Sequence, residues 1–290
     1  MELSRRVGSR TAISLLVLVL GAGALAVAAF ADLGASRRHT IRDGGRFRIT
    51  VVADNGMNID PALPSAQLQS VVEATCARLL SYPDKPPPQG YTLTPEVAKG
   101  YPDISNGGKT FTFVLRRDFR FSNGAPVRAD AFERQIIRVL QSPEGFARDS
   151  LIPDIVGADR VQNGHVEGVE AHGYRLVITL RSAVPDFPAR LTAPWFCAVP
   201  PNLQVDPEGV LTFPMAGPYY VTPESVRGRR IVLRRNPYYR GSRPHHVSEF
   251  VVDGSATDFG DVLDRVLQGK ADWGWAPADI YFDTRRRSVV

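Results

Sequence analysis

The amino-acid sequence predicts a mixed α/β fold, because two hydrophobic periodicities alternate along the 290-residue chain. Apolar residues recur at every second position in segments 46–53 and 110–115, which is the pattern of half-buried strands. They recur at three- and four-residue spacing in segments 129–140 and 258–268, which is the pattern of amphipathic helices. The 23 prolines and 25 glycines supply the turns between such elements.

The first predicted strand is segment 46–53, which alternates and then becomes apolar. Segment 54–58 follows it and is polar and turn-prone. Segment 65–80 predicts a helix, and the proline-rich segment 83–88 ends it because proline cannot continue a helix. The apolar face of this helix consists of Leu68, Val71, Val72, Cys76, Leu79 and Leu80.

The stretch 107–140 combines a strand, a turn and a helix. One side of the strand carries three apolar residues, Phe111, Phe113 and Leu115. The turn is Ser122-Asn123-Gly124, whose residue types tolerate positive φ or bond their own backbone. The helix begins near Ala129, and its apolar face consists of Phe132, Ile136, Val139 and Leu140.

Two hairpins and another helix are predicted in the second half of the chain. Segments 166–180 and 217–235 each read as two strands on either side of a glycine-containing turn. Segment 258–268 predicts a helix with Asp258 as its N-cap and Gly269 just after its last turn.

The N-terminal segment predicts export. Three arginines precede the uncharged run from Thr11 to Ala31, and this run ends in the A-x-A-like site Ala29-Phe30-Ala31. Residues 1–31 are therefore expected to be a cleaved signal peptide or, since the run is long enough to span a bilayer, an uncleaved N-terminal membrane anchor. Residues 32–45 are expected to be a linker.

Composition and motifs exclude several classes of function. The 35 basic and 30 acidic residues give a net charge of only +5, and no dense basic block with interleaved aromatics occurs, so nucleic acid is not an expected partner. No nucleophile elbow, zinc-protease motif or phosphate-binding glycine loop occurs, so we expect no enzyme and no cofactor. His245-His246 lacks partners at metal-ligand spacing, so no metal site is expected.

Five short motifs then occur in the order in which one known family carries them. They are Asn58-Ile59-Asp60-Pro61, Leu93-Thr94-Pro95-Glu96-Val97-Ala98, the S-N-G-x-P-V turn between strand and helix, Ala216-Gly217-Pro218-Tyr219-Tyr220 with Leu233-Arg234-Arg235-Asn236-Pro237-Tyr238-Tyr239, and Leu267-Gln268-Gly269-Lys270-Ala271-Asp272. Over roughly residues 46–275 the chain thereby resembles the extracellular solute-binding proteins of oligopeptide and dipeptide ABC importers, which form bacterial solute-binding protein family 5.

This resemblance implies a particular α/β architecture, a periplasmic-binding-protein type II-like lobe. Lobe one would consist of residues 46–80 and 202–290, and residues 81–201 would form an α+β subdomain inserted into it. Family members continue beyond the segment that matches 267–272 into a second lobe. We therefore expect the second lobe to be missing and the chain to be truncated after lobe one.

The implied function is that of the extracellular solute-binding component of an ABC transporter. Such a component binds peptides or a similar small solute in the cell envelope, in the periplasm or at the outer face of the cytoplasmic membrane, and delivers it to the permease subunits. The alternative is a truncated lobe-one module, anchored in the membrane through Thr11 to Ala31, that no longer binds solute and acts as an interaction protein.

The resemblance also suggests ligand-binding residues, because the loop after the first strand faces the cleft in that family. Asp54 could meet a ligand amine, and Asn55 or Asn58 could meet a peptide group. The alternative for this loop is a self-capped Asx turn. Trp195 could line the cleft or belong to the core.

The two cysteines, Cys76 and Cys197, suggest a disulfide, because an even number of cysteines in an exported chain is typical of bridges. A bridge that closes so long a loop would contribute about 4–5 kcal/mol in the chain-entropy account. The alternative is a buried free thiol at Cys76, on the apolar face of the predicted helix.

Overall fold

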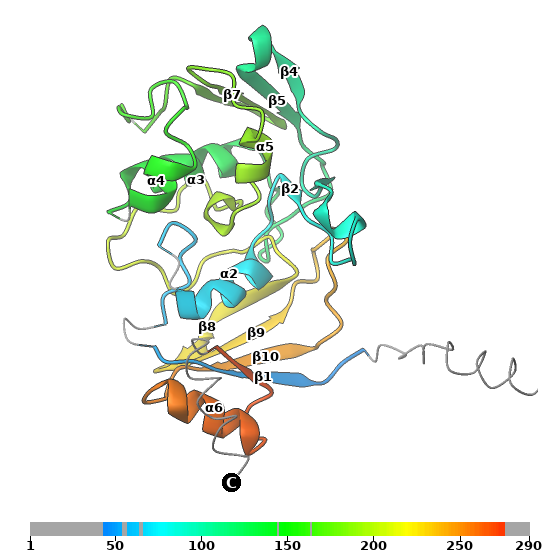
Figure 1. Cartoon of the computed structure of the whole chain (residues 1–290), viewed down its shortest axis with the longest axis vertical. Coiled ribbons are helices and arrows are strands. Elements are labelled where there is room, and N and C mark those ends of the chain that lie inside the picture. Colours follow the sequence, from blue (N-terminus) through cyan, green and yellow to red (C-terminus); the bar gives the residue numbers. More distant parts are fainter. Residues whose placement is uncertain (1–42, 54–56, 64–65, 144, 163, 276–290) are drawn as a thin grey trace, which may run out of the picture. The chain divides into compact units, whose positions relative to one another are not determined.

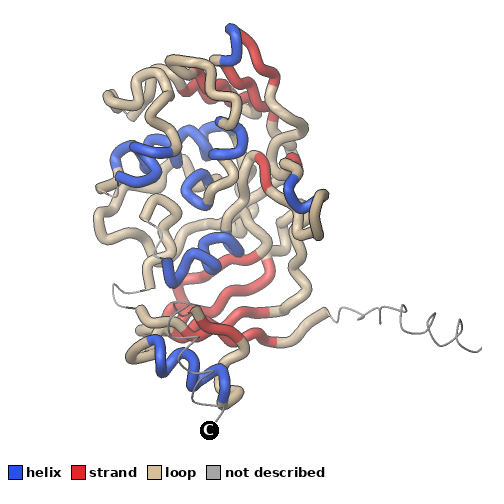
Figure 2. The backbone as a smooth tube through the Cα atoms, in the orientation of Figure 1, coloured by secondary structure: helices blue, strands red, loops and turns tan. Residues whose placement is uncertain are grey.

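The computed structural model describes residues 43–53, 57–63, 66–143, 145–162 and 164–275. These residues form two larger sheets with helices packed against them and a two-stranded ribbon (Figure 1). The strands gather in two separate groups, and long loops join them (Figure 2). No helix within the described ranges is long and apolar enough to cross a membrane. The segment from Thr11 to Ala31 lies outside those ranges.

A mixed five-stranded sheet has the order β11-β1-β10-β9-β8. Its strands are β1 (Arg46–Thr50), β8 (Tyr219–Arg227), β9 (Arg230–Arg235), β10 (Glu249–Asp253) and β11 (Trp273–Gly274). β1 runs parallel to β10 and β11, whereas β10 pairs with β9, and β9 with β8, in antiparallel fashion. The hairpin predicted in segment 217–235 is thus confirmed, with Gly228 at φ +57° in its turn.

Helices cover the two faces of this mixed sheet. α2 (Gln69–Thr75) lies on one face and α6 (Phe259–Leu267) on the other (Figure 1). Alternate residues of β1, β9 and β10 point toward α2 and are apolar, which gives a core that includes Ile49, Val71, Val72, Tyr219, Leu233 and Val252. The core beneath α6 is smaller and consists of Val52, Ala256 and Val262, with Phe259 packed against it.

A second sheet is antiparallel throughout and has the order β4-β5-β7-β6. Its strands are β4 (Asp103–Ser105), β5 (Thr110–Val114), β6 (Val169–His172) and β7 (Arg175–Thr179). Three helices accompany it, α3 (Ala129–Gln141), α4 (Gly145–Ser150) and α5 (Phe187–Arg190). The β2–β3 ribbon (Leu80–Ser81 and Thr94–Pro95) and the 3-10 turns at Ala66–Leu68, Gln89–Tyr91, Asn106–Gly108 and Pro194–Phe196 complete the elements.

The antiparallel sheet and α3 enclose one large hydrophobic core, as the periodicity of segment 107–140 predicts. The predicted core positions of the strand and the helix are all buried, namely Phe111, Phe113, Leu115, Phe132, Ile136, Val139 and Leu140. The hairpin predicted in segment 166–180 is also confirmed, since β6 and β7 pair on either side of Gly173 at φ +60°.

The helix predicted over 65–80 is shorter than expected, because long-range contacts replace its last turns. α2 ends at Thr75, and Cys76 is extended at φ −84° and ψ 138°. Gly217 packs so closely there that a Cβ atom on it would lie 2.4 Å from the carbonyl carbon of Thr75. Leu80 then pairs with Pro95 in the β2–β3 ribbon, which takes the segment out of helical geometry.

Several motif residues join the two sheets through buried polar contacts. Asp60 is fully buried and binds the guanidinium of Arg138 on α3 through both carboxylate oxygens, at 2.9 and 2.5 Å. Glu96 accepts hydrogen bonds from Tyr239 Oη at 2.9 Å and from Arg243 Nε at 2.8 Å. These residues therefore stabilise the fold in pairs, because removing one partner would leave the other charge buried without compensation.

Candidate functional site

The carboxyl ends of β1, β10 and β11 lie at one edge of the mixed sheet, because these three strands are parallel to one another in the sheet. In open α/β sheets, ligands bind outside the carboxyl ends of the strands, where the connections diverge. The described residues at this edge are Ala53 after β1, the turn 254–257 after β10, and Trp275 after β11. This edge is our candidate functional site.

The turn after β10 is built by short-range polar contacts and a close backbone approach. Asp253 Oδ1 accepts a hydrogen bond from the backbone N–H of Ser255 at 2.9 Å, which is an Asx turn. A Cβ atom on Gly254 would lie 2.5 Å from Met57 Sδ and 2.7 Å from Ala53 Cβ. Glycine therefore allows the ends of β1 and β10 to meet closely at the site.

The first turn of α6 begins beside this turn and is capped as the sequence predicts. Asp258 Oδ1 accepts from the backbone N–H of Asp261 at 2.9 Å, and Asp261 Oδ2 accepts from that of Thr257 at 3.1 Å. This arrangement resembles a capping box, except that Asp261 accepts from the residue before the N-cap, and it fixes where the helix starts. Phe259 packs edge-on against Trp275, with ring centroids 5.3 Å apart, so α6 also contacts the end of β11.

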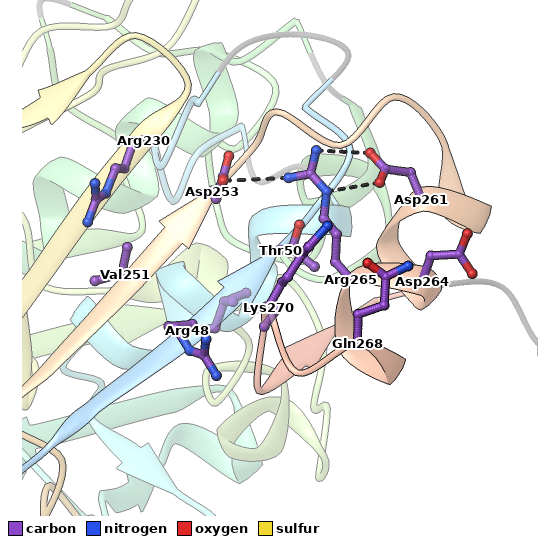
Figure 3. A pocket seen from close by; sticks show the side chains of 12 residues that line it. Arg48, Thr50, Arg230, Val251, Asp253, Asp261, Asp264, Arg265, Gln268 and Lys270 are labelled. Atoms are coloured by element: carbon purple, nitrogen blue, oxygen red, sulfur yellow. Dashed lines mark hydrogen bonds and ion pairs between the residues drawn. The ribbon is translucent and has the colours of Figure 1, made fainter.

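Arg265 of α6 ties the helix to the carboxyl end of β10 (Figure 3). Its Nε donates to Asp261 at 3.0 Å, its Nη1 donates to Ser255 Oγ at 3.0 Å, and its Nη1 lies 3.5 Å from Asp253 Oδ2. The hydrogen bond from Arg265 lowers the pKa of Asp261 below its ordinary value. The carboxylates at this part of the edge are therefore already neutralised by an arginine of the protein.

A groove of about 500 Å³ runs from this edge along the outer face of the sheet, beneath α6 (Figure 3). Its walls are polar, and they include Arg48, Arg230 and Lys270. Arg48 is bound by both oxygens of Asp272, at 3.1 and 2.7 Å, and this bond lowers the pKa of Asp272. On the opposite face, an apolar groove of about 310 Å³ lies between the sheet and α2.

The loop residues expected to contact ligand are only partly covered by the structure. Asp54 and Asn55 lie outside the described residues. Asn58 is half-buried, its Oδ1 accepts from the backbone N–H of Asp60 at 2.8 Å, and its Nδ2 donates to the carbonyl oxygen of Leu63 at 3.3 Å. The side chain of Asn58 thus holds the loop in the Asx geometry that was its alternative role.

The other expected residues lie away from the edge. Trp195 belongs to the 3-10 turn Pro194–Phe196, is half-buried against the large core, and has its ring centroid 5.4 Å from that of Phe146. Cys76 and Cys197 form a disulfide, with their Cα atoms 5.1 Å apart, which attaches the end of α2 to this same turn. The structure therefore does not bring Trp195 to the edge of the mixed sheet.

Sequence reasoning missed the residues that shape the site, namely Asp253, Gly254, Ser255, Arg265 and Arg230. The signal that could have found them is the D-G-S turn between the apolar segment of β10 and a capped helix, since strand ends before helices are common ligand sites. Within the described residues, no cluster of three or more histidine, cysteine or acidic side chains could hold a metal ion.

Comparison with known proteins places this fold in one family. Residues 92–287 match the family described as bacterial extracellular solute-binding proteins, family 5 Middle. Protein XP55 of Streptomyces lividans is 30% identical over 172 residues, which are 57% of this chain and 29% of that protein. The probable deoxycholate-binding periplasmic protein YgiS of Escherichia coli (strain K12) is 28% identical over 191 residues, which are 61% of this chain and 35% of that protein.

Solved structures share the fold. Clavulanic acid biosynthesis oligopeptide binding protein 2 superposes with a TM-score of 0.68 at 23% identity, over 80% of this chain and 44% of that protein. Listeria monocytogenes OppA bound to peptide superposes with a TM-score of 0.61 at 17% identity, over 80% of this chain and 46% of that protein. The predicted fold class, a periplasmic-binding-protein type II-like lobe, is confirmed.

The chain spans about a third of the length of these curated relatives and under half of these structures. The matched family is one of solute-binding transport proteins and not of enzymes, which agrees with the lack of catalytic motifs in the sequence. The chain belongs to the bacterial extracellular solute-binding proteins of family 5.

Proposed function

We propose that the chain is the solute-binding component of an ABC importer for peptides, and that it delivers peptide to membrane permease subunits. The observation that carries this proposal is the superposition of four fifths of the chain on an oligopeptide binding protein, with a TM-score of 0.68. The bound peptide in the Listeria monocytogenes OppA structure, which has the same fold, supports a peptide as the solute class.

The edge of the mixed sheet supports this function through its backbone. Three parallel strands end there, and an extended peptide laid against the loops that follow them would form main-chain hydrogen bonds that are independent of the peptide sequence. We propose that Asp54 binds the ligand amine and Asn55 a peptide group of the ligand. Asn58 would act with them by fixing the loop, and Trp195 would contribute only to a ligand that extends toward the second sheet.

The proposal includes export and a domain plan. The arginine-led run from Thr11 to Ala31 would direct the chain to the cell envelope as a signal peptide or as a membrane anchor. Residues 46–80 and 202–290 would form lobe one, and residues 81–201 the inserted subdomain. YgiS, named as a probable deoxycholate-binding periplasmic protein, and the nickel-binding periplasmic protein of Escherichia coli (strain K12), which is 29% identical over 156 residues, support the location and define competing solutes.

A thermal-shift and calorimetry screen of the purified chain tests this function. The chain is mixed with dipeptides and oligopeptides, and in parallel with deoxycholate and a nickel–histidine complex. A peptide that binds only the folded state raises the midpoint of unfolding in a saturable way, by an amount that grows with ligand concentration over Kd. A saturable shift with deoxycholate or nickel alone would reject peptides as the solute class. A cooperative melt that no ligand moves would favour the interaction-protein alternative.

A further inference from the structure

The turn of the β8–β9 hairpin carries a basic cluster that the function above does not use. Arg227, Arg229 and Arg230 surround Gly228, and all three side chains are exposed. Within the described residues, none of the three guanidinium groups has a hydrogen bond, an ion pair or a stacking contact with another side chain. Three positive charges on one tight turn, without nearby counter-charges, create a local positive potential. This potential attracts anions.

This basic turn lies at the candidate site, since β9 begins where β10 ends. The backbone N–H of Gly254 donates to the carbonyl oxygen of Arg229 at 2.7 Å, and Arg230 is paired in register with Asp253. The side chain of Arg230 also lines the groove beneath α6 (Figure 3). A solute held at the carboxyl edge of the sheet would therefore lie next to Arg230, with Arg227 and Arg229 in the same hairpin turn.

The carboxylates near the turn do not neutralise it. Asp253 and Asp261 are bound by Arg265, and Asp272 is bound by Arg48. Asp264 is exposed on α6, on the opposite wall of the groove from Arg230 (Figure 3). The hairpin side of the site is thus positive, and among the described residues that line the groove Asp264 is the one carboxylate without an ion pair, facing the arginines from the helix side.

A second observation indicates that the groove is suited to a polar group. Thr50 is 2% exposed, lines the floor of the groove, and its Oγ1 has no hydrogen-bond partner among the described residues. A buried hydroxyl without a partner is uncommon in folded proteins, because leaving it unpaired costs free energy. Because Oγ1 is itself buried, a ligand oxygen or water in the groove could bond it only after a small shift of the side chains that cover it.

We propose that this site prefers acidic peptides, with a carboxylate of the peptide placed against the guanidinium groups of Arg227, Arg229 and Arg230. Guanidinium groups suit this role because they bind carboxylates in a planar, two-point geometry. The preference deepens the proposed peptide-binding function and rests on it. It is a property of the hairpin, and the peptide backbone would still be held by the strand ends.

The test measures dissociation constants by calorimetry for three peptides of equal length that carry glutamate, glutamine or lysine at one position. For the unaltered chain we expect the glutamate peptide to bind at least about tenfold more tightly than the lysine peptide at low ionic strength. Raising the salt to about 0.5 M should shrink this ratio, because exposed charges are screened. The triple variant R227Q/R229Q/R230Q should bind all three peptides within about twofold of one another, whereas the triple lysine variant should retain the preference for glutamate.

The matched control is R175Q, which removes one exposed arginine of β7 in the antiparallel sheet and should leave the ratio unchanged. Circular dichroism should show that every variant stays folded, because the altered side chains are exposed. Equal binding of glutamate and lysine peptides by the unaltered chain, or a preference that survives in the glutamine triple variant, would overturn the inference while the glutamine peptide still demonstrates peptide binding. If no peptide binds, the proposed function fails and the inference falls with it.

Discussion

The mixed sheet and the antiparallel sheet of this chain differ in where their apolar residues lie. The antiparallel sheet, with α3, encloses one large apolar core, and its strands β5, β6 and β7 are buried on the side that faces the helix. The mixed sheet has its apolar residues divided between a core under α2 and a small cluster under α6, and it leaves a polar groove and an apolar groove along its faces. The first region thus gathers its apolar side chains in a single core, whereas the second divides them between its two faces.

The difference originates in how far apart the paired segments are in the sequence. β6 and β7 are joined by a two-residue turn, so local alternation alone specifies their pairing. β1 instead takes its two partners, β10 and β11, from the far end of the described chain. Parallel strands require such long connections, and the connections leave the strand ends open for binding.

Among the contacts that hold these two regions together, three buried ones give ways to test how independent the regions are. The ion pair Asp60–Arg138 joins the loop after β1 to α3. The disulfide Cys76–Cys197 joins the end of α2 to the turn beside Trp195. Tyr239 and Glu96 join the mixed sheet to the ribbon that leads into the antiparallel sheet.

The largest effect is expected for Asp60→Ala. Arg138 is 1% exposed and would lose its carboxylate partner, which leaves a charge buried without compensation. The free energy of unfolding should fall by about 3–5 kcal/mol. Urea denaturation followed by circular dichroism measures this change, and a second transition would show that the two regions unfold separately once the ion pair is lost.

The matched control for this variant is Asp149→Ala, which breaks the ion pair between Asp149 and Arg148. The side chain of Asp149 is 63% exposed. Exposed ion pairs contribute at most about 1 kcal/mol, so this control should change stability little. A loss below 1 kcal/mol for Asp60→Ala would mean that the ion pair is not the main link between the two regions.

A somewhat smaller effect is expected for removing the disulfide with C76S/C197S. The bridge closes a loop with a sequence separation of 121, so its loss increases the entropy of the unfolded chain. We expect a loss of about 2–5 kcal/mol, measured by the same denaturation series, and a similar loss for the unaltered chain under reducing conditions. Two free thiols in the denatured, unreduced protein would show that the bridge does not form.

A third effect depends on pH and concerns Tyr239. Burial raises the pKa of Tyr239 to about 12, whereas an unfolded tyrosine titrates near 10. The stabilisation is fully present below pH 10 and is lost as the pH rises through 12, because the unfolded state releases its proton first. We expect the unaltered chain to lose about 2–3 kcal/mol more than Tyr239→Phe across this window. Urea titration at each pH measures the free energy of unfolding of both proteins. An equal loss of this free energy in both would show that the ionisation of Tyr239 is not coupled to the contact between the regions.

How much could be predicted from sequence follows the same division. In the antiparallel region, Phe111 and Phe113 of the strand and Ile136 of the helix were placed in the core by periodicity alone, because local pairing preserves the pattern. In the mixed region, the sequence predicts a helix over 65–80 that is longer than α2, because nothing in this segment shows that Gly217 packs against Thr75 and ends the helix there. The ion pair Asp60–Arg138 was also missed, because its two partners meet only in the folded chain.

The candidate site shows the same limit. The capped start of α6 and the turn at Gly228 were predicted, since Asp258 and Gly228 act within a few residues of their own positions. The meeting of Arg265 with Asp253 and Ser255 was not predicted although the three residues are close in the sequence, because periodicity does not show that α6 turns its Arg265 side back onto the end of β10. Which charges lie at the candidate site is therefore recognisable only after the arrangement of β10 and α6 is known.

The smallest effect is expected for Asp258→Ala at the start of α6. This variant tests whether the start of α6 can be destabilised without affecting the antiparallel sheet. The side chain of Asp258 accepts from the backbone N–H of Asp261, so its loss leaves that donor without its cap. Stability should fall by about 1 kcal/mol, and Asp258→Ser should recover most of it because serine also caps helices. Hydrogen exchange should confine the added exchange to α6 and the turn 254–257, whereas the antiparallel sheet keeps its protection, because the described contacts of α6 are with β1, β11 and the end of β10 in the mixed sheet. Faster exchange in β5 or β7 as well would show that the edge of the mixed sheet and the closed core form a single cooperative unit.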